Sequence, residues 1–128
     1  MWAWGEKHWE LWNSKSCKWY SKASLRRWLG DPKHDVLLIA RSGDTLVGMC
    51  VAHTIRDFAY WTGLFIEKKY RGNGIATKLV KKMTSLLRKQ GVKEIVLSVN
   101  AKNDCALSLF ESFGFKKGYQ TIPLYMKL

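Results

Sequence analysis

A glycine-rich segment, YRGNGIATKL at residues 70–79, carries the clearest chemical signal in the sequence. It follows a run of strand-forming residues at 58–66 and precedes an amphipathic helical pattern that begins at Ile75. A glycine turn between a strand and a helix lets backbone N–H groups approach phosphate oxygens, and the helix N-terminus adds about half a positive charge. The segment is therefore predicted to bind a phosphate-containing ligand.

Two common phosphate-binding loops do not match this segment. The dinucleotide-binding motif needs a third glycine, and Thr77 stands in its place. The P-loop ends in Gly-Lys followed by Ser or Thr, whereas this segment ends in Thr77-Lys78-Leu79. Neither kind of nucleotide-binding loop is therefore predicted.

Hydrophobic spacing predicts the elements that position the loop. Apolar runs predict strands at 36–40, 45–55, 58–66 and 92–99, and the segments FKKGY and PLYMKL predict two closing strands. Helical spacing predicts helices at 6–20, 24–29, from Ile75 to Gly91, and from a cap at Asn103 to Phe113. Strands that alternate with helices in the middle of the chain indicate a mixed α/β fold in which helices cover a sheet.

Size and charge limit the class of protein. The 128 residues, 47% of them hydrophobic, predict one domain over 1–128. Lys and Arg number 22 against 10 Asp and Glu, and the resulting net charge of +12 attracts polyanions such as nucleic acid, acidic lipid or a phosphate-rich cofactor. No apolar run reaches the ~18 residues of a membrane span, and no signal core is evident, so a cytoplasmic protein without membrane contact is expected.

The cysteines indicate neither a disulfide framework nor a metal site. Cys17, Cys50 and Cys105 are odd in number and share no metal-type spacing. They are predicted to be reduced, buried thiols, and no metal ligand is assigned.

Two segments together resemble the signatures of the GNAT superfamily of acyl-CoA-dependent N-acetyltransferases. LFIEKKYRGNGIATKLV at 64–80 resembles its pyrophosphate-binding motif, and NDCALSLFESFGF at 103–115 resembles its second motif, an Asn, then Ala-x-x-Leu-aromatic, then Gly-Phe. The resemblance covers nearly the whole chain. It implies a central mixed, mainly antiparallel sheet flanked by helices, with the family's first strand missing or atypical here.

The resemblance also implies acetyl-CoA as co-substrate. Backbone amides of the glycine loop would hold its pyrophosphate, the strand before the loop would pair with the pantetheine arm, and Asn103 would bond that arm. The residues implied in cofactor binding are Leu64, Phe65, Ile66, Arg71, Gly72, Asn73, Gly74, Ile75, Ala76, Thr77, Asn103 and Phe110.

The implied reaction is direct attack of a primary amine on the acetyl thioester. Phe110 stands where the family usually has a tyrosine that protonates the leaving thiolate, and Ser98 stands where many protein amino-terminal acetyltransferases have a glutamate. His53 and Glu67 are the candidate bases, and Tyr125 is the candidate acid.

The acceptor is a small-molecule or protein amine, and the sequence leaves open whether the chain forms a homodimer. Five tryptophans before residue 20 either line an acceptor cleft or pack helices onto the sheet. Two alternatives remain: a GNAT-like module that binds CoA without turnover, and a basic nucleic-acid-binding domain. The second is disfavoured because the chain lacks a recognisable nucleic-acid motif.

Overall fold

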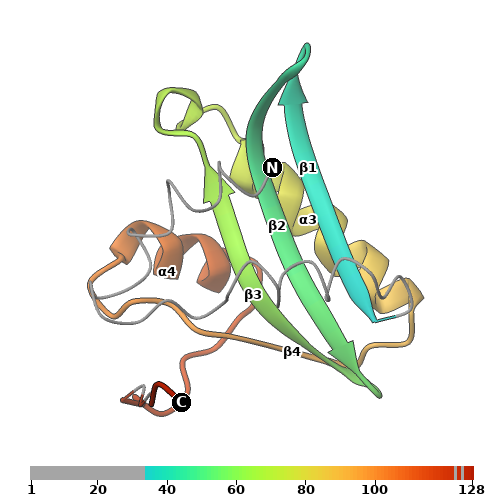
Figure 1. Cartoon of the computed structure of the whole chain (residues 1–128), viewed down its shortest axis with the longest axis vertical. Coiled ribbons are helices and arrows are strands. Elements are labelled where there is room, and N and C mark those ends of the chain that lie inside the picture. The colour runs from blue at the N-terminus through green and yellow to red at the C-terminus, as the bar shows by residue number, and fades with distance from the viewer. Residues whose placement is uncertain (1–33, 123, 125) are drawn as a thin grey trace.

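One four-stranded sheet organises the computed structural model, which describes residues 34–122, 124 and 126–128. The strands follow one another in the order β1-β2-β3-β4 (Figure 1). They are β1 (Asp35–Ser42), β2 (Thr45–Ile55), β3 (Phe58–Ile66) and β4 (Glu94–Leu97), and the helices are η2 (Lys68–Tyr70, a 3-10 helix), α3 (Ile75–Lys89) and α4 (Asp104–Ser112).

The sheet is mixed and mainly antiparallel. β2 pairs antiparallel with both β1 and β3, whereas β3 and β4 are parallel. In Figure 1, α3 lies behind the sheet and α4 lies to the left of β3. This arrangement confirms the predicted fold class of a mixed α/β sheet flanked by helices.

The apolar stripe of α3 fixes the main core. Leu79, Val80, Met83 and Leu87 recur on one helical face and are buried. They form one cluster with strand residues that point to the same side of the sheet, namely Val36, Cys50, Ala52, Ala59 and Trp61. Within the described part of the chain, no helix is both long and apolar enough to cross a bilayer.

A second, smaller cluster lies on the opposite face of the sheet. It consists of Met49, Val51 and Phe65, with Leu37 packed against it. Successive residues of a strand point to opposite faces, so the neighbours of the α3-facing residues belong to this side. The sheet therefore has one face covered by α3 and another face with its own buried side chains.

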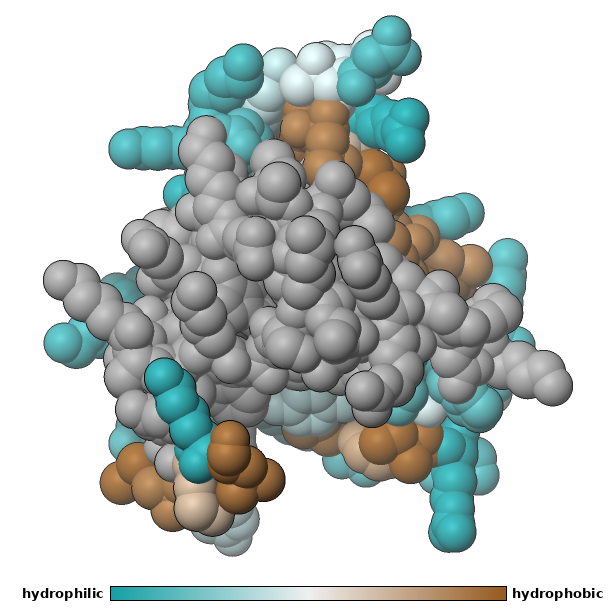
Figure 2. Space-filling view, viewed as in Figure 1, coloured by the Kyte–Doolittle hydropathy of each residue, from teal (hydrophilic) through white to brown (hydrophobic). Residues whose placement is uncertain are grey.

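The final predicted strands differ from the structure. β4 covers Glu94–Leu97 rather than 92–99, and its residues are exposed or half-buried. No strand forms in the described residues of 115–128, where Ile122 and Leu124 are 86% and 92% exposed. Apolar side chains gather near this end of the chain, at the lower left of Figure 2. A strand needs a neighbour to satisfy its backbone groups, and the described residues offer this segment none.

Several predictions concern residues outside the described part. They are the helices at 6–20 and 24–29, the tryptophans before residue 20, Cys17, the family's first strand and Tyr125. These stay predictions from sequence.

The two described cysteines have different environments. Cys50 is fully buried, and burial raises the pKa of its thiol from 9.0 to about 12, although a backbone hydrogen bond at Leu38 opposes the shift. Because its pKa is raised, this thiol stays protonated at neutral pH and is a poor nucleophile. Cys105 is exposed, so the prediction that it is buried was wrong. It is the second residue of α4, a short helix whose described buried residue is Phe110.

Candidate cofactor-binding and active site

β3 and β4 separate partway along β3. Their parallel ladder joins Phe58–Trp61 to Glu94–Leu97, whereas β3 continues to Ile66. The β2–β3 register contains an irregularity that gives β3 one extra residue, Thr62. A bulge bends a strand and increases its twist. In the described structure, β3 beyond Trp61 is thus paired with β2 alone, and its other edge has no strand partner among the described residues.

Two buried side-chain hydrogen bonds hold the bulge. Trp61 Nε1 donates to the carbonyl oxygen of Gly63 at 2.9 Å, and Thr62 Oγ1 donates to the carbonyl oxygen of Val51 at 3.2 Å. Each bond satisfies a buried carbonyl, which would be costly to leave unpaired. The separation of the strands is therefore built into the local sequence of β3.

The loop after β3 is fastened to the end of that strand. Arg71 Nε donates to the carbonyl oxygen of Ile66 at 3.0 Å. Asn73 Nδ2 donates to the carbonyl oxygen of Tyr70 at 3.1 Å. These two side chains are consequently used to shape the loop, and a ligand would meet mainly its backbone.

Two glycines of this loop adopt left-handed backbone angles. Gly72 and Gly74 have φ of 79° and 75°, a region that other residues rarely adopt. A Cβ built on either glycine meets no atom within 4 Å. The space beside both residues is therefore open, as it must be if a ligand approaches the backbone there.

α3 begins at this loop without a side-chain cap. Gly74 is the cap residue, and the first intrahelical bond runs from the N–H of Lys78 to its carbonyl oxygen at 3.1 Å. The N–H groups of Ile75, Ala76 and Thr77 precede that bond and have no carbonyl within the helix to bond. The first turn contains no acidic residue. This helix end is suited to an anion.

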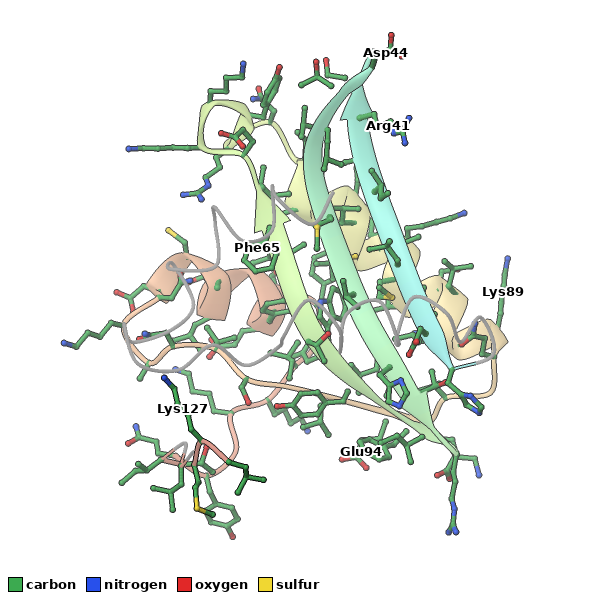
Figure 3. All side chains as sticks on the ribbon, viewed as in Figure 1. Arg41, Asp44, Phe65, Lys89, Glu94 and Lys127 are labelled. Atoms are coloured by element: carbon green, nitrogen blue, oxygen red, sulfur yellow. The ribbon has the colours of Figure 1, made fainter. Side chains whose placement is uncertain are left out.

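Several basic residues belong to segments next to this helix end. Lys68 and Lys69 belong to η2, directly before the loop. Arg41, Lys78 and Lys82 line an open groove of about 470 Å³ between the end of β1 and the start of α3. Figure 3 labels Arg41 near the end of β1, below Asp44 at the tip of the β1–β2 hairpin. The positive charge raises the local concentration of phosphate ligands.

The three strand residues predicted to contact the cofactor use their side chains elsewhere. Leu64 and Ile66 are partly buried and pack against the main core. Phe65, labelled in Figure 3, is 4% exposed and belongs to the cluster on the opposite face. Only the backbone of this stretch remains to meet a ligand in the gap.

Asn103 and Phe110 have separate places in α4. Asn103 caps the helix, because its Oδ1 accepts from the N–H of Ala106 at 3.1 Å. Its Nδ2 remains as a donor. Phe110 is 5% exposed and stacks edge-to-face with Trp61 and Phe115, with ring centroids 5.6 and 5.3 Å away. Phe110 is therefore part of the core that supports β3.

His53 has a carboxylate partner that the sequence reading missed. Asp35 Oδ1 contacts Nδ1 of His53, and the two side chains are 5% and 28% exposed. They lie 18 residues apart in the sequence, on β1 and β2, where they are register partners. No local sequence motif predicts this pair, because only the β1–β2 register places Asp35 opposite His53.

The second candidate base, Glu67, lies between β3 and η2. Glu67 follows β3 directly, and its backbone N–H donates to the carbonyl oxygen of Val47 at 2.8 Å. At about 3.3 Å per strand residue, it is on the order of 20 Å from Trp61, where the strands begin to separate. The structure thus places Glu67 near the loop and far from the start of the gap. The candidate acid, Tyr125, lies outside the described residues.

The sequence of the chain matches a known protein family. The family model described as "Acetyltransferase (GNAT) family" matches residues 2–115. The chain is 34% identical over 95 residues to an acetyltransferase of Agrobacterium fabrum, a match that covers 73% of this chain and 68% of that protein. It is 43% identical over 56 residues to N-alpha-acetyltransferase 30 of Schizosaccharomyces pombe, covering 44% of this chain and 37% of that relative.

A solved structure shows the same fold. The crystal structure of an aminoglycoside acetyltransferase from an uncultured soil metagenomic sample superposes with a TM-score of 0.75 at 18% identity, covering 97% of this chain and 83% of that one. Its match includes the described sheet and helices, and the family model includes both the glycine loop and α4. The chain belongs to the acetyltransferase (GNAT) family.

Proposed function

We propose that this chain transfers an acetyl group from acetyl-CoA to a primary amine of a small molecule or a protein. One observation carries the proposal: an uncapped helix N-terminus, an open glycine loop and an unpaired edge of β3 meet at one place. Together these features suit a long ligand that has phosphates at one end and an amide-containing arm at the other.

The pyrophosphate belongs at the glycine loop. The N–H groups from Arg71 to Ala76, with Thr77 in the first turn of α3, would donate to its oxygens. The left-handed angles of Gly72 and Gly74 leave the backbone uncovered for this contact. Nearby lysines and Arg41 balance the remaining negative charge.

The pantetheine arm belongs along the open edge of β3. From Thr62 to Ile66, backbone groups on this edge can pair with the amides of the arm as a further strand would. The arm would run from the loop back to the start of the gap, which places the thioester near Trp61 and Gly63. A backbone N–H there can polarise the thioester carbonyl and stabilise the oxyanion that forms on it.

The acetyl transfer requires a neutral amine and a leaving thiolate. Nitrogen attacks the carbonyl carbon, the C–S bond breaks, and CoA leaves. Phe110 is buried and has no group that could supply a proton. A thiolate leaves fairly well near neutral pH, so a general acid, which contributes about 10²- to 10⁴-fold, is dispensable for measurable transfer.

The acceptor is proposed only as a class. The relatives include an N-alpha-acetyltransferase and the similar structures include an aminoglycoside acetyltransferase. A net charge of +12 repels strongly cationic polyamines, which favours a neutral amine, an amino sugar or a protein amine. We also propose that the chain forms a single domain and acts in the cytoplasm.

Calorimetry with acetyl-CoA and a thiol-release assay over an amine panel test this function. The panel contains an aminoglycoside, peptides with free amino termini and a polyamine. We expect saturable binding of acetyl-CoA and thiol release that depends on an amine. Tight binding without release from any amine would favour the non-catalytic CoA-binding alternative. Salt-dependent binding of nucleic acid without acetyl-CoA binding would favour the alternative of a basic nucleic-acid-binding domain.

Asn103→Asp separates the helix cap that Asn103 forms from its proposed contact with the pantetheine arm. The carboxylate still accepts from the N–H of Ala106, so the helix cap and the melting temperature should be nearly unchanged. The Nδ2 donor is lost, and a negative charge replaces it, so acetyl-CoA should bind about tenfold more weakly. Calorimetry and thermal unfolding measure the two effects. Unchanged affinity would leave Asn103 with the helix cap alone.

A further inference from the structure

We propose that four polar side chains in a row across the sheet, Asp35, His53, Tyr60 and Ser98, take up the proton that the attacking amine loses. The proposal rests on the acetyl transfer proposed above. It assigns the positioning role to Asp35 and the contact nearest the reacting atoms to the hydroxyls of Tyr60 and Ser98.

The strand register places the row on one face of the sheet. Asp35 is paired with His53, His53 with Tyr60, and Tyr60 with Val96. Residues directly opposite on neighbouring strands share a face and have Cβ atoms about 5 Å apart. All three polar residues are sequence neighbours of α3-facing residues, so they lie on the opposite face. The row thus runs from the β1 edge to β4.

The first pair of the row has the geometry of an oriented base. A carboxylate oxygen of Asp35 contacts Nδ1 of His53, and a carboxylate can only accept there. The proton of neutral imidazole is therefore held on Nδ1, which leaves Nε2 as the basic nitrogen.

The second oxygen of Asp35 argues that the carboxylate has more than a structural role. Oδ2 is buried and has no hydrogen-bond partner in the described structure. A buried polar atom left unpaired costs about 1–3 kcal/mol, and such atoms in native proteins call for an explanation. The cost is understandable if the function of Asp35 is to act on His53, whose protonation brings a positive charge beside it.

The other end of the row lies where β3 and β4 separate. Tyr60 is the last residue but one of the β3–β4 ladder, and Ser98 is the first residue after β4. Their hydroxyl oxygens are 3.4 Å apart. The thioester of the proposed cofactor position lies beside this point. His53 lies on β2, Tyr60 lies on β3 and Ser98 follows β4, so the two hydroxyls lie farther along the row toward the proposed thioester position than His53 does.

The proton balance of the step is simple. The amine nitrogen forms its bond to the carbonyl carbon as the C–S bond breaks. One proton leaves the nitrogen through the hydroxyls, each of which both donates and accepts, and reaches Nε2 of His53. The imidazolium returns one proton to the departing thiolate, so the products are the amide, the CoA thiol and neutral imidazole.

The variants Asp35→Asn, His53→Ala and Tyr60→Phe test the row in the thiol-release assay. We expect kcat to fall about 10²-fold in His53→Ala and about tenfold in the other two, with the affinity for acetyl-CoA unchanged in all three. Added imidazole should restore part of the activity of His53→Ala. The double variant Asp35→Asn/His53→Ala should be no slower than His53→Ala, because Asp35 acts through His53.

Thr54→Val is the matched control. The buried hydroxyl of Thr54 donates to the carbonyl oxygen of His34 at 3.0 Å, beside the row but on the α3 side of the sheet. This variant should lower stability and leave kcat unchanged. Tyr60→Phe keeps the ring, so it stays informative even if a change at Asp35 prevents folding.

The possible results distinguish failure of the proposed proton transfer through the row from failure of the proposed acetyl transfer itself. An active wild-type protein whose kcat is unchanged in Tyr60→Phe, and whose His53→Ala variant keeps its rate, would overturn the row alone. Independent, multiplicative losses in the double variant would overturn the positioning role of Asp35. A wild-type protein that releases no thiol from any amine would overturn both the proposed function and the row.

Discussion

Gly74→Glu is expected to weaken acetyl-CoA binding by about tenfold or more, a loss of about 1.4 kcal/mol. Gly74 has φ of 75°, and the space beside its Cβ position is empty. A glutamate there brings a side chain and a negative charge to the place where the N-terminus of α3 would meet the pyrophosphate. Calorimetry with acetyl-CoA measures the change.

Gly91→Glu provides the matched control for this prediction. Gly91 follows α3 at its other end, with φ of 83° and equally open space at its Cβ position. Both variants suffer similar backbone strain, so both should lose stability in thermal unfolding. Only Gly74→Glu should lose cofactor affinity. Equal affinities in the two variants would remove the cofactor from this loop.

Trp61→Ala should have the largest effect on stability, with a loss of about 3–5 kcal/mol in the free energy of unfolding. The Trp61 side chain is 2% exposed and meets the rings of Phe110 and Phe115. A small domain is stable by only about 5–15 kcal/mol, so the variant would be close to unfolding. Urea denaturation followed by circular dichroism measures the loss.

Trp61→Phe distinguishes packing from hydrogen bonding at the same position. It keeps an aromatic ring against Phe110 but removes the N–H that donates to the buried carbonyl of Gly63. The expected loss is about 1–3 kcal/mol, the cost of an unpaired buried acceptor. If Trp61→Ala were no worse than Trp61→Phe, the aromatic cluster would contribute little to stability.

Core side chains support the strand next to the proposed thioester position. Trp61 is the last β3 residue paired with β4, and its indole also bonds the bulge. Phe110, which stands in the place of the family's tyrosine, packs against that indole. The Phe110 ring thus helps to hold β3 at the end of the β3–β4 ladder. The proton chemistry is accordingly proposed for the opposite face.

The sequence by itself determined the elements with strong local signals. The strands at 45–55 and 58–66 and the helix from Ile75 were predicted with the bounds that the structure has, or nearly so. Their signals are short-range: alternation in the strands, a 3.6-residue stripe in the helix, and the glycine turn between them. The glycine loop was found for the same reason, since all its parts are adjacent in the sequence.

Tertiary pairing decided the ends of the sheet. The segments at 92–99 and 115–128 have strand-like composition, yet only Glu94–Leu97 forms a strand among their described residues. A strand exists where a neighbour accepts its backbone hydrogen bonds, and composition alone does not show whether that neighbour is present. The β3–β4 ladder ends at Trp61 and Leu97, and this end leaves the remainder of β3 without a strand partner on that edge among the described residues.

Register decided the Asp35–His53 pair. Counting back regularly from the turn between Ser42 and Thr45 would pair Asp35 with Ala52, which faces α3. An irregularity between Ala40 and Arg41 shifts the ladder by one residue and pairs Asp35 with His53 instead. Because side chains alternate between faces, this single shift decides which side chain Asp35 meets. The sequence names the residues that can carry a proton, but only the folded sheet brings them into one row.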